Sequence, residues 1–237
     1  MTPAMTLAEL QSFGIDIDEP AYGRLERFVD LLLAENRKTN LTAIRERADA
    51  WLVHVCESLA VLPLLDDSSA SSLIDIGCGG GVPGIPLACA RPRIDVALLD
   101  ATRKKIEACE RIANGLRLSN VATIWSRAER AAHDPRYREQ FEVVTARAVA
   151  ALPLLAEYAA GFVQPGGRCI FFKTRQALER ESSAAAGALR SCRLSHEQTL
   201  EYDLGPHGRR VVAVYRKLAA LPSRLPRSPG QAKKRPL

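Results

Sequence analysis

Residues 73–86 constrain the fold of this chain more than any other stretch. They read LIDIGCGGGVPGIP, an apolar run that ends in a cluster of glycines and continues toward a helix. Glycine lets the backbone turn tightly and lets a ligand approach where a Cβ would not fit. The stretch therefore predicts a strand, a turn and a helix, with a ligand at the carboxyl edge of a sheet. A glycine loop that serves only as a turn is the alternative.

Short apolar runs recur along the chain with room for a helix between them. They lie at residues 73–76, 96–99, 121–125, 143–144 and 169–172. Strands that alternate with helices imply right-handed crossovers and a mainly parallel sheet. A last run, 211–215, follows a Gly-Pro-His-Gly turn signal and predicts an antiparallel strand at one side. The predicted fold class is α/β and Rossmann-like.

The two ends of the chain differ from this pattern. Apolar residues recur at helical spacing over residues 20–37 and about 48–62, where Pro63 is expected to end the second helix. Residues 218–237 hold four prolines and no apolar periodicity, which predicts an irregular segment without a helix. We therefore expect an N-terminal helical cap (1–68), an α/β domain (69–217) and a C-terminal arm (218–237).

The positive charge is concentrated at the C-terminal end. The net charge is +6, and residues 216–237 carry seven basic and no acidic side chains, so the rest of the chain sums to −1. A basic tail is expected where it, or its neighbourhood, meets a polyanion. Its basic residues are Arg216, Lys217, Arg224, Arg227, Lys233, Lys234 and Arg235.

Several classes of protein are disfavoured by the sequence. The six cysteines form no C-x-x-C pair and have no histidine at ligand spacing, so neither a zinc site nor a redox motif is expected. The N-terminus does not resemble a signal peptide, and no run of about 18 apolar residues occurs. Scattered free cysteines suit a reducing compartment. We expect a cytoplasmic protein without a metal.

Two kinds of cofactor compete for the glycine turn. Gly79, Gly81 and Gly84 satisfy the G-x-G-x-x-G pattern of dinucleotide-binding folds. That interpretation would push Gly77 into the strand and would set Asp75 against a pyrophosphate of the same sign of charge. An adenosyl ligand with a positive sulfonium and ammonium group would instead be attracted by Asp75. The adenosyl ligand is therefore favoured.

Asp100 ends the second apolar run and is the expected ribose-binding residue. A carboxylate at this place can accept hydrogen bonds from both ribose hydroxyls. The alternative is that Asp100 merely caps the helix that is expected to begin near Arg103. The glycine turn upstream favours the ribose.

Several motifs together carry a family resemblance. They are Asn-Leu-Thr at 40–42, His54 with Glu57 and Ser58, the glycine turn followed by Val-Pro-Gly-Ile-Pro at 82–86, Leu-Leu-Asp at 98–100, Ser-Arg-Ala-Glu at 126–129 and Ala-Arg-Ala at 146–148. Their order and spacing, from about residue 20 to 217, resemble those of the bacterial small-subunit ribosomal RNA guanine-N7 methyltransferases, the methyltransferase G or glucose-inhibited division protein B family. The chain departs from the family pattern at Glu57, Cys78 and Gly80 and after Lys173.

The resemblance implies a class I S-adenosylmethionine-dependent methyltransferase fold and transfer of a methyl group to N7 of guanine 527 in 16S ribosomal RNA. It implies that Gly77 and Val82 line the cofactor pocket, that Asp100 binds the ribose, and that Ala128 and Glu129 flank the adenine. Asp75, Gly79 and Gly81 of the glycine turn complete the expected cofactor-binding set. The partner implied is 16S ribosomal RNA or the small ribosomal subunit.

Arg147 is the candidate catalytic residue. It follows the run at 143–146, which places it at the cofactor edge of the sheet, and the resemblance implies that it reaches toward both cofactor and substrate. A surface ion pair is the alternative. Because guanine N7 carries an in-plane lone pair, the reaction needs no base, and the protein's main task is to position the reactants. His54 and Glu57, three residues apart, could order the helical cap against the cofactor loop through a hydrogen bond. For His54 itself, a packed structural role is favoured over direct catalysis.

Basic side chains are the expected contacts to RNA. Aromatic residues make up only 5% of the chain, so recognition should rely on shape and phosphate contacts. A solvated surface is the alternative for these side chains. The candidates are Lys173, Arg209, Arg210, Arg224, Arg227, Lys233, Lys234 and Arg235.

Two other functions remain open from the sequence. A small-molecule methyltransferase on the same fold would share the glycine turn and Asp100 but would not need a basic tail. A non-catalytic ribosomal RNA-binding or assembly protein would not need an intact cofactor site, and a cofactor titration separates it from an enzyme.

Overall fold

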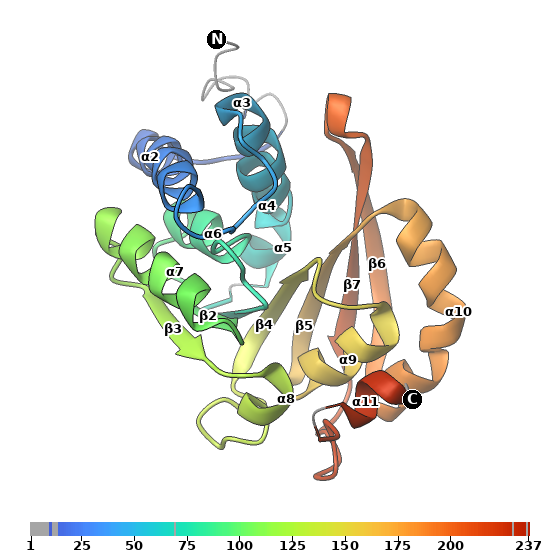
Figure 1. Ribbon diagram of the computed structural model, residues 1–237. Helices are drawn as coiled ribbons and strands as arrows, with labels where there is room; N and C mark the ends of the chain where they lie inside the picture. The colour runs from blue at the N-terminus through green and yellow to red at the C-terminus, as the bar shows by residue number, and fades with distance from the viewer. Residues whose placement is uncertain (1–9, 11–13, 69, 229, 236) are drawn as a thin grey trace. The chain divides into compact units, whose positions relative to one another are not determined.

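The computed structural model describes residues 10, 14–68, 70–228, 230–235 and 237 (Figure 1). The chain divides into two compact units. The first comprises the described residues up to Ser71 together with Cys78–Trp125, and the second comprises Ser72–Gly77 together with the described residues from Ser126 onward. The boundary crosses the glycine turn, which is continuous in sequence from one unit to the other.

The first unit is mainly helical, with one pair of parallel strands. Its strands pair so that Asp100 lies opposite Trp125 at their carboxyl ends. Helix α2 begins where Asp18 accepts a hydrogen bond from the N–H of Ala21, and its buried face includes Phe28 and Leu32. The elements are α2 (Glu19–Asn36), α3 (Arg47–Ala50), the π-helical turn η1 (Trp51–Cys56), α4 (Glu57–Leu59), α5 (Leu62–Asp67), α6 (Gly84–Ala90), β2 (Asp95–Asp100), α7 (Arg103–Gly115) and β3 (Val121–Trp125).

The second predicted helix differs from the structure at its end. The helical run breaks after Leu59, and Pro63 lies in the first turn of α5 instead of ending the preceding helix. Proline is tolerated there because the first-turn N–H groups have no partner within the helix. By length and composition alone, the described helical residues 47–67 could cross a membrane. However, 61% of their most apolar 18-residue stretch is buried inside the protein, as in a core helix.

The second unit is built on five strands in the order β1-β4-β5-β7-β6. Strands β1, β4 and β5 run parallel, whereas β7 is antiparallel to both β5 and β6. The mainly parallel sheet and its late antiparallel strand are confirmed. The elements are β1 (Ser72–Ile76), α8 (Ala128–Ala131), β4 (Phe141–Arg147), α9 (Leu152–Ala160), β5 (Val163–Lys173), α10 (Arg175–Ser191), β6 (Leu194–Asp203), η2 (Gly205–His207), β7 (Arg209–Lys217) and α11 (Gln231–Lys234).

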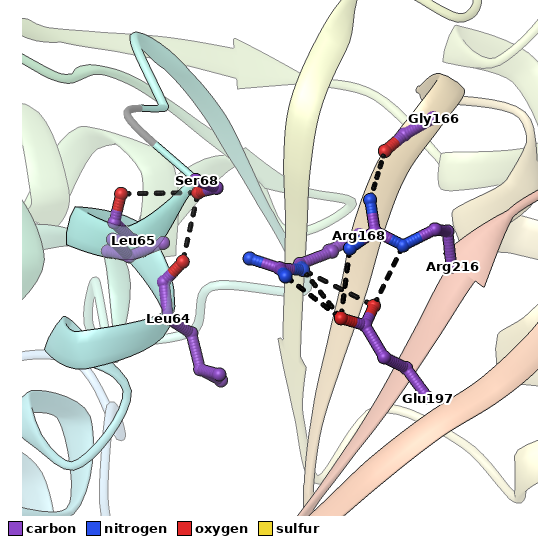
Figure 2. Close-up of polar contacts among 7 residues, drawn as sticks. All are labelled: Leu64, Leu65, Ser68, Gly166, Arg168, Glu197 and Arg216. Carbon is purple, nitrogen blue, oxygen red and sulfur yellow. Dashed lines mark hydrogen bonds and ion pairs between the residues drawn. The ribbon is translucent and has the colours of Figure 1, made fainter.

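Strand β6 was not predicted. It is mostly polar and only partly buried, so it lacks the apolar run by which the other strands are recognised. A bulge at Glu197 interrupts its register with β7. Figure 2 shows the Glu197 carboxylate accepting hydrogen bonds from the guanidinium groups of Arg168 on β5 and Arg216 on β7, at 2.8 and 2.9 Å. The strand is thus joined to the sheet by its antiparallel ladder with β7, and the Glu197 ion pairs add to that attachment.

The described residues of 218–237 pack on the second unit instead of extending away from it. Leu221, Leu225 and Ala232 are buried, and Arg138 donates hydrogen bonds to the backbone carbonyls of Leu221 and Leu225. The irregular path was expected, but the short helix α11 was not. Its four residues, 231–234, are too few to show a helical pattern of apolar residues in the sequence. Helix α11 lies against α9 (Figure 1).

Candidate functional site

The glycine turn has the backbone that the sequence predicts. Gly77, Gly79 and Gly81 have φ angles of 66°, 58° and 84°, in the left-handed region that favours glycine. A Cβ on Gly77 would lie 2.7 Å from Cγ2 of Val149, and one on Gly81 would lie 2.4 Å from Cδ1 of Ile85. The turn and its packing therefore require these glycines on their own account, independently of any ligand. Val82, next in the chain, is buried.

Asp100 anchors the glycine turn in the first unit. Its Oδ2 accepts a hydrogen bond from the N–H of Gly79 at 3.1 Å, and its Oδ1 accepts one from the N–H of Thr102 at 2.7 Å. The thiol of Cys109 donates to the carbonyl of Gly79 at 3.3 Å. Asp100 thus also supports the approach to α7, as the capping alternative suggested, although Thr102 is the N-cap residue. A carboxylate has about four acceptor sites, so Asp100 retains capacity for further donors.

His54 supports the same turn through a partner that the sequence did not indicate. Its Nε2 lies 2.8 Å from Oγ1 of Thr42. The adjacent Leu41 packs at Gly80, where a Cβ would come within 3.2 Å of the leucine Cβ. His54 is buried, as is Glu57 one helical turn later. The expectation of a packed structural histidine is confirmed, and its ring bonds to the Asn-Leu-Thr motif.

The other expected cofactor residues belong to the second unit. Asp75 is fully buried on β1, where its Oδ1 accepts a hydrogen bond from the hydroxyl of Thr145 at 3.1 Å. Ala128 begins α8, and Glu129 beside it is buried. Burial raises the pKa of the Tyr158 hydroxyl, and the charge of Glu129 adds to that shift. Arg147 is the last residue of β4 and is half-buried.

Lys173 does not point freely into solvent at the end of β5. Its side chain is 10% exposed, and its Nζ donates to the carbonyl of Ala150 and to Oε2 of Glu181, both at 2.8 Å. Glu181 lies on α10 and was not singled out from the sequence. The sequence near Glu181 does not indicate this contact, because its partners Leu152 and Lys173 lie on two other elements.

The remaining basic candidates fall into two groups. Arg209 is exposed and Arg210 half-buried at the start of β7, and Arg224, Lys234 and Arg235 are exposed; the side chain of Lys233 lies outside the described part. Arg227 differs, since it is 17% exposed and forms a salt bridge at 2.7 Å with Glu157, which is 1% exposed. The charge of Arg227 is therefore compensated inside the protein by Glu157. Among the described residues, no cluster of His, Cys, Asp or Glu could hold a metal ion.

Comparison with solved structures identifies the fold. A putative O-methyltransferase from Klebsiella pneumoniae superposes with a TM-score of 0.58 at 14% identity, covering 90% of this chain and 95% of that one. A geranyl diphosphate C-methyltransferase from Streptomyces coelicolor superposes with a TM-score of 0.51 at 15% identity, covering 75% and 86%. The class I methyltransferase fold is confirmed, and the dinucleotide-binding alternative is set aside.

Sequence comparison identifies the family. The family described as rRNA small subunit methyltransferase G, GidB, matches residues 21–204. Proteins named ribosomal RNA small subunit methyltransferase G from Acetivibrio thermocellus and Carboxydothermus hydrogenoformans are 35% and 36% identical, over 95% of this chain in both cases and 92% and 95% of the relatives. The chain therefore belongs to the rRNA small subunit methyltransferase G family.

Proposed function

We propose that this protein transfers a methyl group from S-adenosylmethionine to N7 of guanine 527 in 16S ribosomal RNA, in the cytoplasm. The observation that carries the proposal is the link between Asp100 and the N–H of Gly79. It joins the acidic end of β2 to the glycine turn in a chain of the methyltransferase G family.

The residues of the turn fit an adenosyl cofactor. Asp100 holds its charge beside backbone N–H groups and keeps acceptor sites for two ribose hydroxyls. We assign the cofactor contacts to Asp75, Gly77, Gly79, Gly81, Val82, Asp100, Ala128, Glu129 and Arg147. The cofactor supplies a methyl group on a positive sulfur, which an acidic environment stabilises.

The reaction depends on the positioning of the two reactants more than on acid–base catalysis. The N7 lone pair attacks the methyl carbon directly, and an oriented encounter can lower the barrier by about 7–11 kcal/mol. Burial raises the pKa of Cys56, Cys89, Cys169 and Cys192 to about 12, so these thiols stay protonated at neutral pH. Direct transfer without a thiolate nucleophile is consistent with this. Arg147 is assigned to orient the substrate beside the cofactor.

The RNA is expected to be bound through its phosphates by exposed basic side chains. We assign this role to Arg209, Arg210, Arg224, Lys233, Lys234 and Arg235, and we assign Arg227 and Lys173 mainly to internal contacts because each is paired inside the protein. A folded small subunit, or its RNA, should therefore be a much better substrate than a short naked RNA.

Nucleoside mass analysis of 16S ribosomal RNA tests the proposal. Cells that lack this protein should lose one N7-methylguanosine, which maps to position 527 and returns with the wild-type gene but not with Asp100→Ala. Unchanged ribosomal RNA in the deletion strain would overturn the proposed substrate. If purified protein bound S-adenosylmethionine yet methylated only small molecules, the small-molecule alternative would replace it, and absence of cofactor binding would favour the non-catalytic one.

A further inference from the structure

The loop that follows Arg147 is held in an unusual conformation. Ala148 has a φ angle of 56°, which non-glycine residues rarely adopt and which costs about 1–2 kcal/mol. The next residue, Val149, occupies the space beside Gly77 where a Cβ would lie. Such a conformation persists only where surrounding contacts enforce it, and such sites are often functional.

Two side chains from other elements enforce this loop. Lys173 Nζ donates to the carbonyl of Ala150, and Glu181 Oε2 accepts from the N–H of Leu152, each at 2.8 Å. Lys173 and Glu181 also pair with each other at 2.8 Å. The loop is thus fixed at one carbonyl and one N–H, two residues apart, by the Lys173–Glu181 ion pair, which we call the loop clamp.

Glu181 also completes the start of α9. The N-cap residue, Ala151, has no side chain that could accept a hydrogen bond from the first turn. Glu181 supplies that acceptor from α10, which packs beside α9 (Figure 1). An anion at a helix N-terminus is favourable both as an acceptor and through the helix dipole. The position of the loop is therefore set jointly by α9, α10 and β5.

The surroundings of Glu181 favour its charged form. Burial alone raises the pKa of Glu181, but the hydrogen bonds from Lys173 and from the N–H of Leu152, together with the charges of Lys173 and Arg180, outweigh burial, so the net pKa lies below the ordinary value. Both side chains of the clamp are largely buried, at 10% and 14% exposed. Loss of Glu181 removes the acidic partner of the largely buried Lys173, whereas loss of Lys173 leaves Glu181, among the described residues, with only the more distant Arg180, at 3.8 Å.

We propose that Glu181 is a positioning residue for methyl transfer, which acts through Lys173 and the N–H of Leu152 to hold residues 148–151 and thereby Arg147. The inference rests on the proposed function of Arg147. It gives Lys173 a role in the loop instead of the RNA contact expected from the sequence. Neither clamp residue needs to touch cofactor or RNA for its loss to slow the reaction.

Single-turnover methyl transfer to small ribosomal subunits, with cofactor and subunits saturating, tests the clamp. Glu181→Ala should slow transfer by about 10- to 100-fold, because small misplacements of reacting groups have effects of this size. Glu181→Gln keeps an acceptor for the Leu152 N–H and should recover part of the rate. If the alanine variant does not fold, the glutamine variant still tests the proposal. The matched control is Glu179→Ala on the same helix, whose side chain is 66% exposed, and it should match wild type.

A double mutant separates positioning from general damage. If Glu181 acts through Arg147, adding Glu181→Ala to Arg147→Ala should slow transfer by no more than about twofold beyond Arg147→Ala alone, since coupled residues are non-additive. Arg147→Ala by itself should slow transfer strongly and melt within a few degrees of wild type. Full additivity of the two losses would overturn the clamp proposal.

Hydrogen exchange gives a readout that does not depend on activity. The Leu152 amide should exchange faster in Glu181→Ala than in wild type or Glu179→Ala. Unchanged exchange would refute the clamp even if the enzyme proved inactive for other reasons. If wild type fails to methylate small subunits, or Arg147→Ala transfers at the wild-type rate, the proposed function is at fault, and exchange still decides on the clamp.

Discussion

The glycine turn and the loop after Arg147 are each held by a carboxylate, in different ways. Asp100 accepts hydrogen bonds from two backbone N–H groups, those of Gly79 and Thr102. Glu181 accepts one from the N–H of Leu152 and one from the ammonium group of Lys173. N–H dipoles leave the charge of Asp100 intact, whereas a cation neutralises that of Glu181. We therefore expect a charge compensated inside the protein to serve structure, and a charge held by N–H groups to remain available to a ligand.

The largest effect should come from the carboxylate that stays available. Asp100→Ala should weaken S-adenosylmethionine binding by about 2–4 kcal/mol, because the ribose hydroxyls lose a charged acceptor. Calorimetric titration measures the affinity, and circular dichroism confirms that the fold is kept. Asp100→Asn retains one acceptor oxygen and should lose less. An unaltered affinity in Asp100→Ala would remove the ribose assignment and, with it, the contrast between the two carboxylates.

The same distinction predicts different effects on stability for two basic residues of the C-terminal segment. Arg227 compensates buried Glu157, so Arg227→Ala should lower the free energy of unfolding by about 3 kcal/mol, near the low end for a broken buried pair. Arg224 is exposed, and Arg224→Ala should leave stability within about 0.5 kcal/mol. Urea denaturation measures both.

The matching experiment on RNA binding uses the salt dependence of affinity. Replacing Arg224, Lys234 and Arg235 together should flatten the slope of log affinity against log salt by about two to three units, if each contacts a phosphate. Equal slopes for the triple variant and wild type would leave these side chains as a solvated surface. Truncation at residue 222 is a poorer test, because it also removes buried Leu225 and Ala232.

A steric change at Gly77 should sharpen the link between the glycine turn and the clamped loop. Gly77→Ala places a Cβ at a φ of 66° and 2.7 Å from Val149 Cγ2, and we expect it to cost about 2 kcal/mol of stability and to slow methyl transfer. In a Val149→Ala background the steric part should disappear, leaving the backbone cost. Thermal melts of the four proteins measure the coupling; strictly additive losses would mean that the two residues do not share this space.

The smallest effect should be a shift in acid stability. The folded-state pKa of Glu181 lies below its ordinary value of 4.5. The clamp's contribution to stability is therefore fully present above about pH 4.5 and is lost as the pH falls through the folded-state pKa. Melting temperatures of wild type and Glu181→Gln should differ at pH 7 and converge as the pH falls progressively below 4.5. A gap that stayed constant across this range would show that the charge of Glu181 does not stabilise the fold.

Much of the fold could be predicted because its signals are local. The glycine turn, the buried strands β1, β2, β4, β5 and β7, and the place of Asp100 at a strand end follow from apolar runs and turn residues a few positions apart. Asp100 also lies only two residues from Thr102, so its bond to that N–H belongs to the same local pattern.

The clamp, the Arg227 pair and strand β6 could not be predicted from the sequence. Glu181 and Leu152 are 29 residues apart, and Arg227 and Glu157 are 70 apart, so only the tertiary fold brings them together. The local sequence likewise does not indicate the contacts that distinguish Arg227 from Arg224, three residues earlier. Strand β6 lacks the apolar run that indicates a strand, because its backbone ladder with β7 and the ion pairs of Glu197 hold it in the sheet.

The polar character of β6 has a consequence for how the molecules behave in concentrated solution. β6 is the last strand in the order of the second unit, and a regular, apolar edge of this kind invites strand addition from another molecule and eventual aggregation. The bulge at Glu197 and the exposed His196 and Glu201 interrupt that template. A polar, bulged strand can thus end a sheet without offering a regular edge to a neighbour, and we expect it to disfavour self-association when molecules are crowded.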